Sequence, residues 1–529
     1  MSAITSGPLA AQAARSLAGP ALWVFAAALV WLALLAGLRP LMLPDEGRYV
    51  GVAWEMLRSG DWLTPTLNGL PYFHKPPLFY WITAASMTLF GPGEWAARAA
   101  PLLGAAVAST ALWLFVRRWW GIAVAQMSLV ALLAQPLFYL GGQFANLDML
   151  VAGCITLTVV LLAHAALAFE QGSSYKAALV AAYAAAALGV LAKGLIGAVL
   201  PALVIGVWLL LRMRWRTLWA LLSGPGALLF FLVAAPWFLA MQARFPDFLH
   251  YFFVVQHFKR FTTGGFNNAQ PFWFYPALLL LFSLPWWPWL WAQVWRRERL
   301  VASPTGLRLL MWVWLVGVMM FFSLPKSKLV GYVLPALAPL AVLVADGFVS
   351  TCQRPWQRHR GWWLSAAVAA LLSVVTLVAL AVRPPYSTKE LAGLLRRQHL
   401  SGQPVLMLEH YYFDLPLYAG LREPAQVVLD WAEPTLRQRD SWPKELADAG
   451  DFAPELAAQV LVPSRQLRPA LCAHAVSWVL GSPAAYGLYP FLAQAQQVGV
   501  VRDAALWRVE PAIPALKAAL RCAETPNGG

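Results

Sequence analysis

The stretch MLVAGCITLTVVLLAHAALAF, residues 149–169, contains no acidic side chain, no lysine and no arginine. As a helix rising about 1.5 Å per residue, it is long enough to cross the roughly 30 Å hydrocarbon core of a membrane. A helix also satisfies every backbone polar group of the segment without water. The stretch therefore predicts a transmembrane helix.

Similar apolar runs lie on both sides of this stretch, and the whole chain is 60% hydrophobic and 12% charged. A soluble protein of this length would be roughly a quarter charged. The runs predict an all-α polytopic membrane protein with about eleven spans. The first run lacks the small-residue cleavage site of a signal peptide, so we interpret it as an uncleaved span. The other spans are predicted at roughly 20–42, 94–117, 122–143, 176–192, 195–211, 217–240, 271–295, 305–323, 329–349 and 361–383.

The net charge of +15 would suit a nucleic-acid-binding protein, but the positions of the basic residues argue against that class. Most of them stand in short loops between apolar runs, and no soluble segment carries a basic patch interleaved with aromatic residues. Cytoplasmic loops of membrane proteins carry such an excess of bases. With a cytoplasmic N-terminus, the loops predicted on that side carry Arg117, Arg118, Lys176, Arg212, Arg214, Arg216, Arg296, Arg297, Arg299, Arg354, Arg358 and Arg360.

The opposite face receives a different polar set, centred on residues 43–81, LPDEGRYVGVAWEMLRSGDWLTPTLNGLPYFHKPPLFYW. Within it, residues 46–58 and 77–90 are too short to span and predict juxtamembrane helices. Polar groups thus gather at one membrane edge, the periplasmic edge of the inner membrane in a Gram-negative bacterium, and we predict the active site there. The same face also receives Asn146, Asp148, Lys193, the loop 241–270, residues 325–328 and residues 384–529.

Residues 384–529 predict a periplasmic α/β domain that follows a transmembrane domain of residues 1–383. Of the 24 acids in the chain, 14 lie in this segment, and no run in it is long enough to span. Short apolar stretches such as 405–408 alternate with helical patterns. The large periplasmic loops before it are predicted at 44–92 and 241–270. A disulfide between Cys472 and Cys522 is a hypothesis, since a periplasmic domain permits oxidation.

Three carboxylates at this face are candidate catalytic groups: Asp45, Glu46 and Asp148. A carboxylate at the membrane edge can act as a general base, or it can orient an acceptor or a sugar. Asp45 also stands where an N-cap would precede the helix 46–58, and Asp148 could cap the helix that follows Asn146. On the residues alone, both interpretations stay open.

Cations on the same face predict a binding site for a phosphate or pyrophosphate group. Lys75 precedes Pro76-Pro77, a helix start where backbone N–H groups are free to meet an anion, and Tyr72 lies nearby. The alternative is a lysine that snorkels beside a tyrosine of the interfacial aromatic belt. Further predicted phosphate-binding residues are Lys193, Lys259, Arg260, Lys326 and Lys328.

His74 and His257 are candidate metal ligands, although two histidines without a tight motif are a weak signal. A divalent metal, zinc or magnesium, is thus a candidate cofactor. The sequence contains no glycine-rich nucleotide loop of the Walker or dinucleotide type, so a soluble nucleotide donor is not expected.

Residues 43–81 resemble the first periplasmic loop of the lipid A aminoarabinose transferases. These are C-type glycosyltransferases in the superfamily of the protein O-mannosyltransferases. The resemblance continues in order over nearly the whole chain, and the ordered set is specific although each block alone is weak. The further blocks are FANLDML (144–150), LGVLAKGLIGAVLP (188–201), QHFKRF (256–261) with Gln270-Pro271 after it, SLPKSKLVGYVLPALAPLAVL (323–343) and DLPLYAGLREP (414–424).

The resemblance implies the GT-C fold, with about 11–13 transmembrane helices plus juxtamembrane helices. It implies an inverting transfer of a sugar from an undecaprenyl phosphate carrier to lipid A, another surface glycan or a protein. Asp45 matches the functional first-loop aspartate of the family, and Asp148 matches a second acidic position. The positions that hold the carrier phosphate are matched by Tyr72, Lys75 and Tyr332, with Arg260 close to a phosphate-binding arginine.

The same resemblance makes His257 the counterpart of a metal-site histidine. At residue 74 the chain departs from the family, because the aminoarabinose enzymes typically carry a glutamate before the lysine and this chain has His74. A glutamate there could help to hold a metal or the cation of an amino sugar. The identity of the sugar and of the acceptor therefore stays open at this point.

Two other functions are alternatives: a lipid-linked glycan flippase or other transporter, and an enzyme similar to the O-antigen ligases. Transporters often show inverted repeats and buried charges at mid-depth of the membrane. This sequence shows no internal repeat, and its predicted spans are almost free of charge at their centres. The pattern favours chemistry at the membrane edge.

Overall fold

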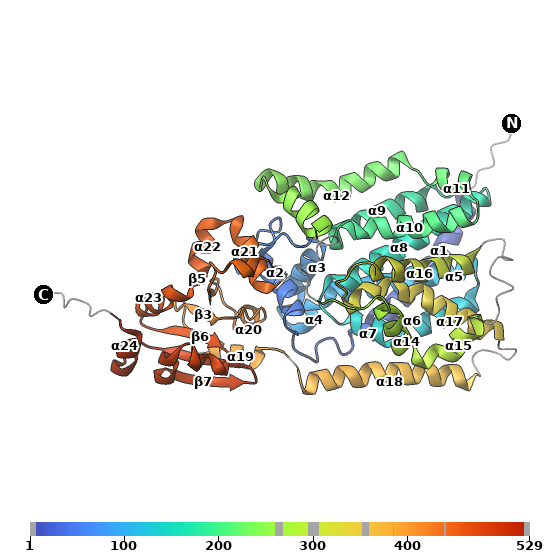
Figure 1. Ribbon diagram of the computed structural model, residues 1–529. Helices are drawn as coiled ribbons and strands as arrows, with labels where there is room; N and C mark the ends of the chain where they lie inside the picture. The colour runs from blue at the N-terminus through green and yellow to red at the C-terminus, as the bar shows by residue number, and fades with distance from the viewer. Residues whose placement is uncertain are drawn as a thin grey trace.

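The apolar runs form long helices that lie side by side in the computed structural model of the protein (Figure 1). The structure describes residues 7–259, 268–294, 306–351, 359–384, 386–438 and 441–522. Within these ranges, six helical segments are long and apolar enough to cross a membrane. They are α5 (Ala99–Trp119), α8 (Leu147–Glu170), α9 (Lys176–Lys193), α12 (Gly224–Arg244), η4 (Val330–Ala336) continued by α17 (Leu337–Thr351), and α18 (Arg360–Val382).

The remaining predicted spans are shorter or broken. The helices α6 (Ile122–Leu133) and α7 (Pro136–Gly142) are bent by 65° and make a seventh span if taken as one. Pro136 begins α7, because proline lacks the N–H that a continuing helix needs and suits a first turn. The span predicted at 271–295 is instead α14 (Phe274–Phe282), η2 (Leu284–Trp286) and α15 (Trp287–Val294). Shorter apolar helices are residues 19–33 of α1 (Gly7–Ala33), α3 (Leu78–Phe90), α10 (Ile196–Leu211) and α16 (Leu307–Ser323).

The fold class is therefore confirmed as a mostly helical, multi-span membrane protein. The sequence predicted about eleven full spans, whereas the described ranges contain six helices of spanning length, or seven if the bent pair is taken as one. At its centre α8 packs between α5 and α9. Glycines permit the contact, since a Cβ on Gly153 would meet the carbonyl oxygen of Gly104 at 2.4 Å. Small residues let membrane helices approach closely in this way.

The first loop folds into a small cap at one end of these helices. It contains α2 (Asp45–Ser59), the strands β1 (Thr66–Leu67) and β2 (Leu70–Pro71), then α3 and α4 (Glu94–Ala97). The carboxylate of Glu55 holds the β1–β2 turn by accepting from the N–H of Asn68 at 2.6 Å and of Gly69 at 2.9 Å. Gly60 ends α2 in the left-handed conformation, and Asp45 is the first helical residue rather than an N-cap.

The C-terminal segment forms the predicted α/β structure around a six-stranded sheet of order β5-β4-β3-β6-β8-β7. The strands β3 to β6 run parallel, and β8 is antiparallel to both β6 and β7. Cys472 and Cys522 form a disulfide, which confirms the hypothesis drawn from the sequence. The strands are β3 (Val405–Leu408), β4 (Gln426–Leu429), β5 (Leu461–Pro463), β6 (Ser477–Gly481), β7 (Gln496–Val501) and β8 (Ala504–Val509).

Short helices cover this sheet. They are α19 (Lys389–Gln398), α20 (Leu415–Ala419), η6 (Pro434–Arg437), α21 (Trp442–Asp451), α22 (Pro454–Val460), η7 (Ser464–Gln466), α23 (Leu467–Cys472), η8 (Pro483–Gly487), η9 (Pro490–Gln494) and α24 (Pro514–Leu520). We refer to this structure as the C-terminal domain; its boundary at residue 383 stays a prediction.

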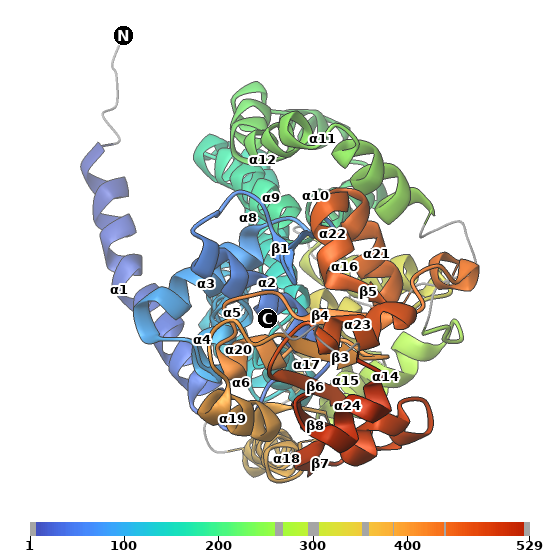
Figure 2. The ribbon, with the colours of Figure 1, turned by 90° about the vertical axis from the view of Figure 1, so that its left-hand side faces the viewer.

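The C-terminal domain docks on the first loop. Asn68 and Ala425 exchange hydrogen bonds of 2.8 Å in both directions, and the N–H of Leu41 donates to the hydroxyl of Tyr418 at 2.8 Å. Figures 1 and 2 show the domain at one end of the bundle, with α1 and α18 at its periphery and α11 (Trp215–Ala220) at the far end. At that far end Arg212 pairs with Glu170 at 2.8 Å.

Candidate active site

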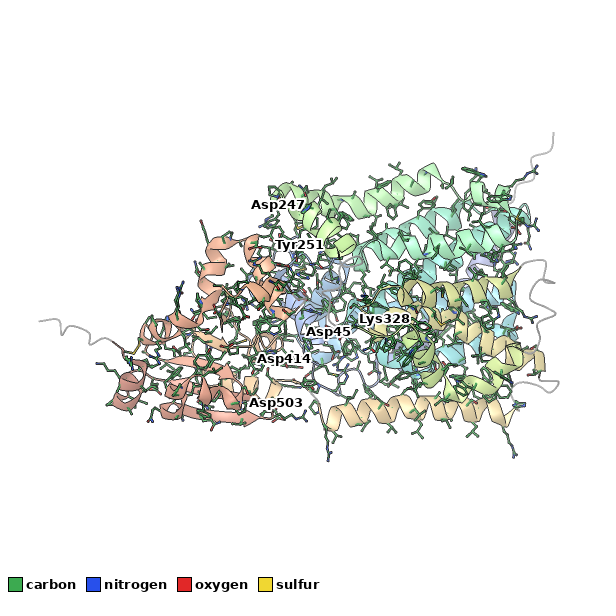
Figure 3. The ribbon with its side chains drawn as sticks, in the orientation of Figure 1. Asp45, Asp247, Tyr251, Lys328, Asp414 and Asp503 are labelled. Carbon is green, nitrogen blue, oxygen red and sulfur yellow. A yellow bond between two sulfur atoms is a disulfide. The ribbon has the colours of Figure 1, made fainter. Side chains whose placement is uncertain are left out.

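A cavity of about 850 Å³ lies where the first loop, the start of α8, the end of α9, η4 and the C-terminal domain meet. Asp45 lies at this junction (Figure 3). Most of the described candidates from the sequence lie on its wall, although they come from four separate stretches of the chain. These wall residues are Asp45, Tyr72, His74, Lys75, Asp148, Lys193 and Tyr332.

Asp45 belongs to an ion-pair network that crosses to the C-terminal domain. Arg48, one helical turn further along α2, contacts Asp45 at 2.5 Å and Glu445 at 2.6 Å. The hydroxyl of Tyr72 donates to the second oxygen of Glu445 at 2.9 Å. The spacing of Asp45 and Arg48 on a helix was a signal that could have identified Arg48. Glu445 gives no local signal, because it lies 397 residues after Arg48.

The pKa of Glu445 follows from this setting. Burial raises the pKa, but the positive charge of Arg48, the nearby His74 and the hydrogen bond from Tyr72 outweigh it and lower the pKa to about 2. Glu445 is therefore a carboxylate throughout the physiological range. It fixes both Arg48 and Tyr72 against the C-terminal domain.

The second carboxylate, Asp148, forms an ion pair with a lysine of the cavity wall. Asp148 is buried in the first turn of α8 and forms an ion pair with Lys193 at the end of α9. The ammonium of Lys193 lies 4.2 Å from the centre of the Tyr332 ring. Asn146, rather than Asp148, is the N-cap, and its side chain accepts from the N–H of Asp148 at 3.0 Å. Gly331 makes room, because a Cβ there would meet a carboxylate oxygen of Asp148 at 2.0 Å.

His74 connects the first loop to η1 (His250–Lys259) and to α21. Its ring stacks on Tyr72 with centres 4.6 Å apart, and its Nε2 shares a 2.8 Å hydrogen bond with the hydroxyl of Tyr251. That hydroxyl also donates to Asp448 at 3.3 Å. In the described part of the chain, no three His, Cys, Asp or Glu side chains are grouped so that they could hold a metal ion. The described residues thus do not fit a metal at His74.

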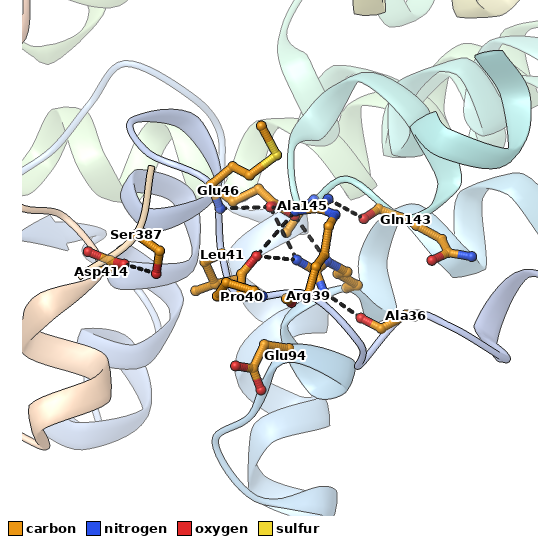
Figure 4. Close-up of polar contacts among 12 residues, drawn as sticks. Ala36, Arg39, Pro40, Leu41, Glu46, Glu94, Gln143, Ala145, Ser387 and Asp414 are labelled. Carbon is orange, nitrogen blue, oxygen red and sulfur yellow. Dashed lines mark hydrogen bonds and ion pairs between the residues drawn. The ribbon is translucent and has the colours of Figure 1, made fainter. Parts of the chain in front are cut away.

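Glu46 lies elsewhere than the sequence suggested. It is fully buried and is not among the described residues that line the cavity. Its carboxylate accepts from Arg98 Nε at 3.0 Å, from Arg39 Nη2 at 3.1 Å and from the N–H of Ala145 at 2.8 Å (Figure 4). Burial raises its pKa, but the two guanidinium groups lower it to about 2. The geometry assigns Glu46 to holding the loop against the bundle.

Two predicted phosphate-binding lysines also lie away from the described wall of the cavity. Lys328 is buried and donates to the carbonyl oxygens of Gln270 at 2.9 Å and Pro325 at 2.6 Å. Its ammonium group therefore holds the loop 325–328 against Gln270. Lys326 is exposed. The side chains of His257 and Lys259, and Arg260 as a whole, lie outside the described residues, so their predicted roles stay predictions.

Comparison with known proteins points to one family. A family model described as dolichyl-phosphate-mannose-protein mannosyltransferase matches residues 74–239. Undecaprenyl phosphate-alpha-4-amino-4-deoxy-L-arabinose arabinosyl transferase 2 of Pseudomonas fluorescens Pf0-1 is 34% identical over 65% of this chain and 62% of its own length. The first of these curated relatives are thus matched over less than two thirds of their length.

A longer match extends the likeness. Undecaprenyl phosphate-alpha-4-amino-4-deoxy-L-arabinose arabinosyl transferase 1 of Pseudomonas fluorescens Pf-5 is 32% identical over 75% of this chain and 70% of its own length. Among solved structures, ArnT from Cupriavidus metallidurans in the apo state superposes with a TM-score of 0.74 and 25% identity, over 93% of this chain and 98% of that one. The fold, the site-bearing blocks and these matches agree, and the chain belongs to the family of the undecaprenyl phosphate-alpha-4-amino-4-deoxy-L-arabinose arabinosyl transferases.

Proposed function

We propose that the chain is a glycosyltransferase that moves a sugar from undecaprenyl phosphate to lipid A or another glycan at the periplasmic face of the membrane. The relatives are named as transferases of 4-amino-4-deoxy-L-arabinose, and we propose the same donor sugar here. The observation that carries the proposal is the composition of one cavity. Its wall combines the cations Lys75 and Lys193 with the carboxylates Asp45 and Asp148.

The cations serve the leaving group. A sugar phosphate ester breaks between the sugar carbon and the phosphate oxygen, and the phosphate departs with an added negative charge. Lys75 and Lys193 would stabilise that charge, and Asp148 positions Lys193 above the Tyr332 ring. Because the lipid phosphate is already a good leaving group, placing its charge supplies much of the catalysis.

Asp45 serves the acceptor. An acceptor hydroxyl would attack the sugar carbon from the side opposite the phosphate, which inverts the configuration, and its proton would pass to the Asp45 carboxylate. Arg48 orients that carboxylate, and Glu445 in turn orients Arg48.

The orientation of the protein is part of the proposal. We assign the cavity to the periplasmic edge. The position of α11 at the far end of the bundle supports this assignment, since the loops beside α11 are among the basic loops predicted to be cytoplasmic. A polyprenyl chain could then remain in the outer leaflet while its phosphate enters the cavity.

Reconstituted protein supplied with lipid A and the undecaprenyl phosphate-linked sugar tests the function. Mass spectrometry of lipid A should show the added sugar. We expect Asp45→Asn and Lys75→Ala to lower the transfer rate by about 10²-fold or more, since they remove a general base and a charge at the leaving group. The matched controls Asp247→Asn and Lys517→Ala change residues outside the described cavity wall and should transfer normally.

Normal transfer by both cavity variants would refute the site assignment. Movement of the lipid-linked sugar across the membrane, with no transfer to any acceptor, would identify the protein as a flippase instead.

A further inference from the structure

Asp414 is a fully buried carboxylate of the C-terminal domain and is not among the described residues that line the cavity. It stands at the N-cap position of α20, yet its side chain makes no capping hydrogen bond to that helix. Burying a charge is costly unless the group is hydrogen-bonded. Its partners lie in another segment: one carboxylate oxygen accepts from Ser387 Oγ and from the N–H of Thr388, both at 2.8 Å, and the other accepts from Thr388 Oγ1 at 2.6 Å (Figure 4).

The segment that Asp414 holds is bonded in turn to the first loop. The N–H of Leu43 donates to the carbonyl oxygen of Tyr386 at 3.1 Å, and Leu43 lies two residues before Asp45. Residues 386–388 line the cavity together with Leu43 and Asp45. A chain of hydrogen bonds therefore runs from Asp414, through the linker 386–388, to the backbone that leads into α2.

A second contact joins the same part of the C-terminal domain to α2. A Cβ on Gly47 would lie 3.0 Å from the backbone nitrogen of Asp414 and 3.0 Å from the Cβ of Phe413, so the first turn of α2 rests directly on this backbone. Asp45 and Arg48 belong to the same turn. Figure 3 shows Asp414 and Asp45 at the junction of the domain with the helices. The contact thus sets the position of the turn that carries the proposed base.

We propose that Asp414 is a positioning residue for the transfer reaction: it fixes the linker 386–388 and the first turn of α2, so that the Asp45 carboxylate keeps its place in the cavity. The inference rests on the proposed function, in which Asp45 is the general base. Arg48 orients the side chain of Asp45, whereas Asp414 fixes its backbone. A misplacement of about 1 Å can cost about 10²-fold in rate, so a residue outside the cavity can control the reaction.

Steady-state kinetics with the full-length protein in lipid nanodiscs tests the inference. Asp414→Ala removes all three hydrogen bonds and should lower kcat by about tenfold, with the KM for the donor within about twofold of the wild type. Asp414→Asn keeps an oxygen that accepts from Ser387 and Thr388, and should transfer within about threefold of the wild type. Asp430→Asn is the matched control, since Asp430 is exposed and lies outside the described wall. A wild-type kcat in Asp414→Ala would overturn the inference.

A double variant separates positioning from a general loss of structure. If Asp414 acts through Asp45, its removal has no further effect once the base is gone. The protein with both Asp45→Asn and Asp414→Ala should therefore transfer within about twofold of the residual rate of Asp45→Asn alone. A further tenfold loss in the double variant would show that Asp414 acts independently of Asp45, and the inference would be wrong.

Hydrogen exchange of the backbone N–H groups, measured without substrates, distinguishes a failure of this inference from a failure of the proposed function. Asp414→Ala should speed the exchange of residues 41–47 and leave α8 unchanged, because only the local opening of the first loop becomes easier. Unchanged exchange in residues 41–47 overturns the inference, whether or not the wild type transfers sugar. If the wild type transfers nothing, the function fails, and faster exchange still supports the part of the inference that Asp414 holds this segment.

Discussion

Arg48 holds two carboxylates that come from opposite ends of the chain, Asp45 in the first loop and Glu445 in the C-terminal domain. Its guanidinium has several donors in a fixed plane and can therefore serve both partners at once. Lysine would offer a single point charge at this position. The geometry of the proposed base thus depends on a residue that does not itself react.

Glu445 should make the stability of this junction depend on pH. Its pKa is lowered from 4.5 to about 2, so the stabilisation is complete above the unfolded-state value and is lost as the pH falls from about 4.5 towards 2. The loss is on the order of 3 kcal/mol. Thermal unfolding between pH 6 and pH 3 should show a smaller pH dependence in Glu445→Gln than in the wild type. Glu423→Gln, at an exposed position, should behave as the wild type; equal slopes in all three proteins would contradict this account.

At the residue scale, the sequence singled out charged groups from separate parts of the chain. Lys75, Asp148 and Lys193 stand out because apolar surroundings make a charge conspicuous, and the cavity brings them together. Glu46 looked equivalent to Asp45 next to it, yet on a helix neighbouring residues point in different directions, and Glu46 faces Arg39 and Arg98. Partners across the C-terminal domain could not be predicted, because only the folded chain brings them near.

At the scale of elements, the helices α5 and α8 depend on the absence of side chains where they meet. A Cβ at residue 153 would lie 2.4 Å from a backbone oxygen and 2.8 Å from the Cα of Gly104. Backbone atoms in the middle of a helix cannot move aside without separating the two helices. The contact is therefore intolerant of even one added methyl group.

Gly153→Ala should lower the free energy of unfolding by about 1–3 kcal/mol, measured as the thermal unfolding of the detergent-solubilised protein. Gly206→Ala in α10 is the control, because a Cβ there meets nothing within 4 Å and alanine favours a helix. A Gly153→Ala protein that unfolds at the wild-type temperature would show that the helices can separate without cost.

The periodicity of the sequence predicted most of these elements. Residues 405–408 match β3, and the helix expected at 77–90 is α3. The prediction of one continuous span at 271–295 was wrong, because hydropathy measures only how apolar a run is and does not show where a helix breaks. Pro285 lies in η2 between α14 and α15, and a proline interrupts the backbone hydrogen bonds that a straight span needs.

At the scale of the whole molecule, the C-terminal domain and the loop beside α11 lie at opposite ends of the bundle. The disulfide of Cys472 and Cys522 agrees with a domain in an oxidising compartment. The proposed orientation therefore assigns each end to one side of the membrane, which intact cells can test.

A membrane-impermeant maleimide should label Asp430→Cys in the C-terminal domain of intact cells, and it should label Ser173→Cys only after the inner membrane is permeabilised. Both positions are exposed, and the background replaces Cys154 and Cys352 with serine. Labelling of Ser173→Cys in intact cells, without labelling of Asp430→Cys, would reverse the orientation.

The shared cavity also bears on how the protein is made. One part of its wall ends at Tyr332, and the other begins only at Tyr386 and continues to Ala504. A nascent chain that has inserted its early helices would carry Lys75 and Lys193 on an open surface. The pocket closes only after the last segment has been synthesised and folded onto the first loop. Only the finished chain can therefore complete the wall of this cavity.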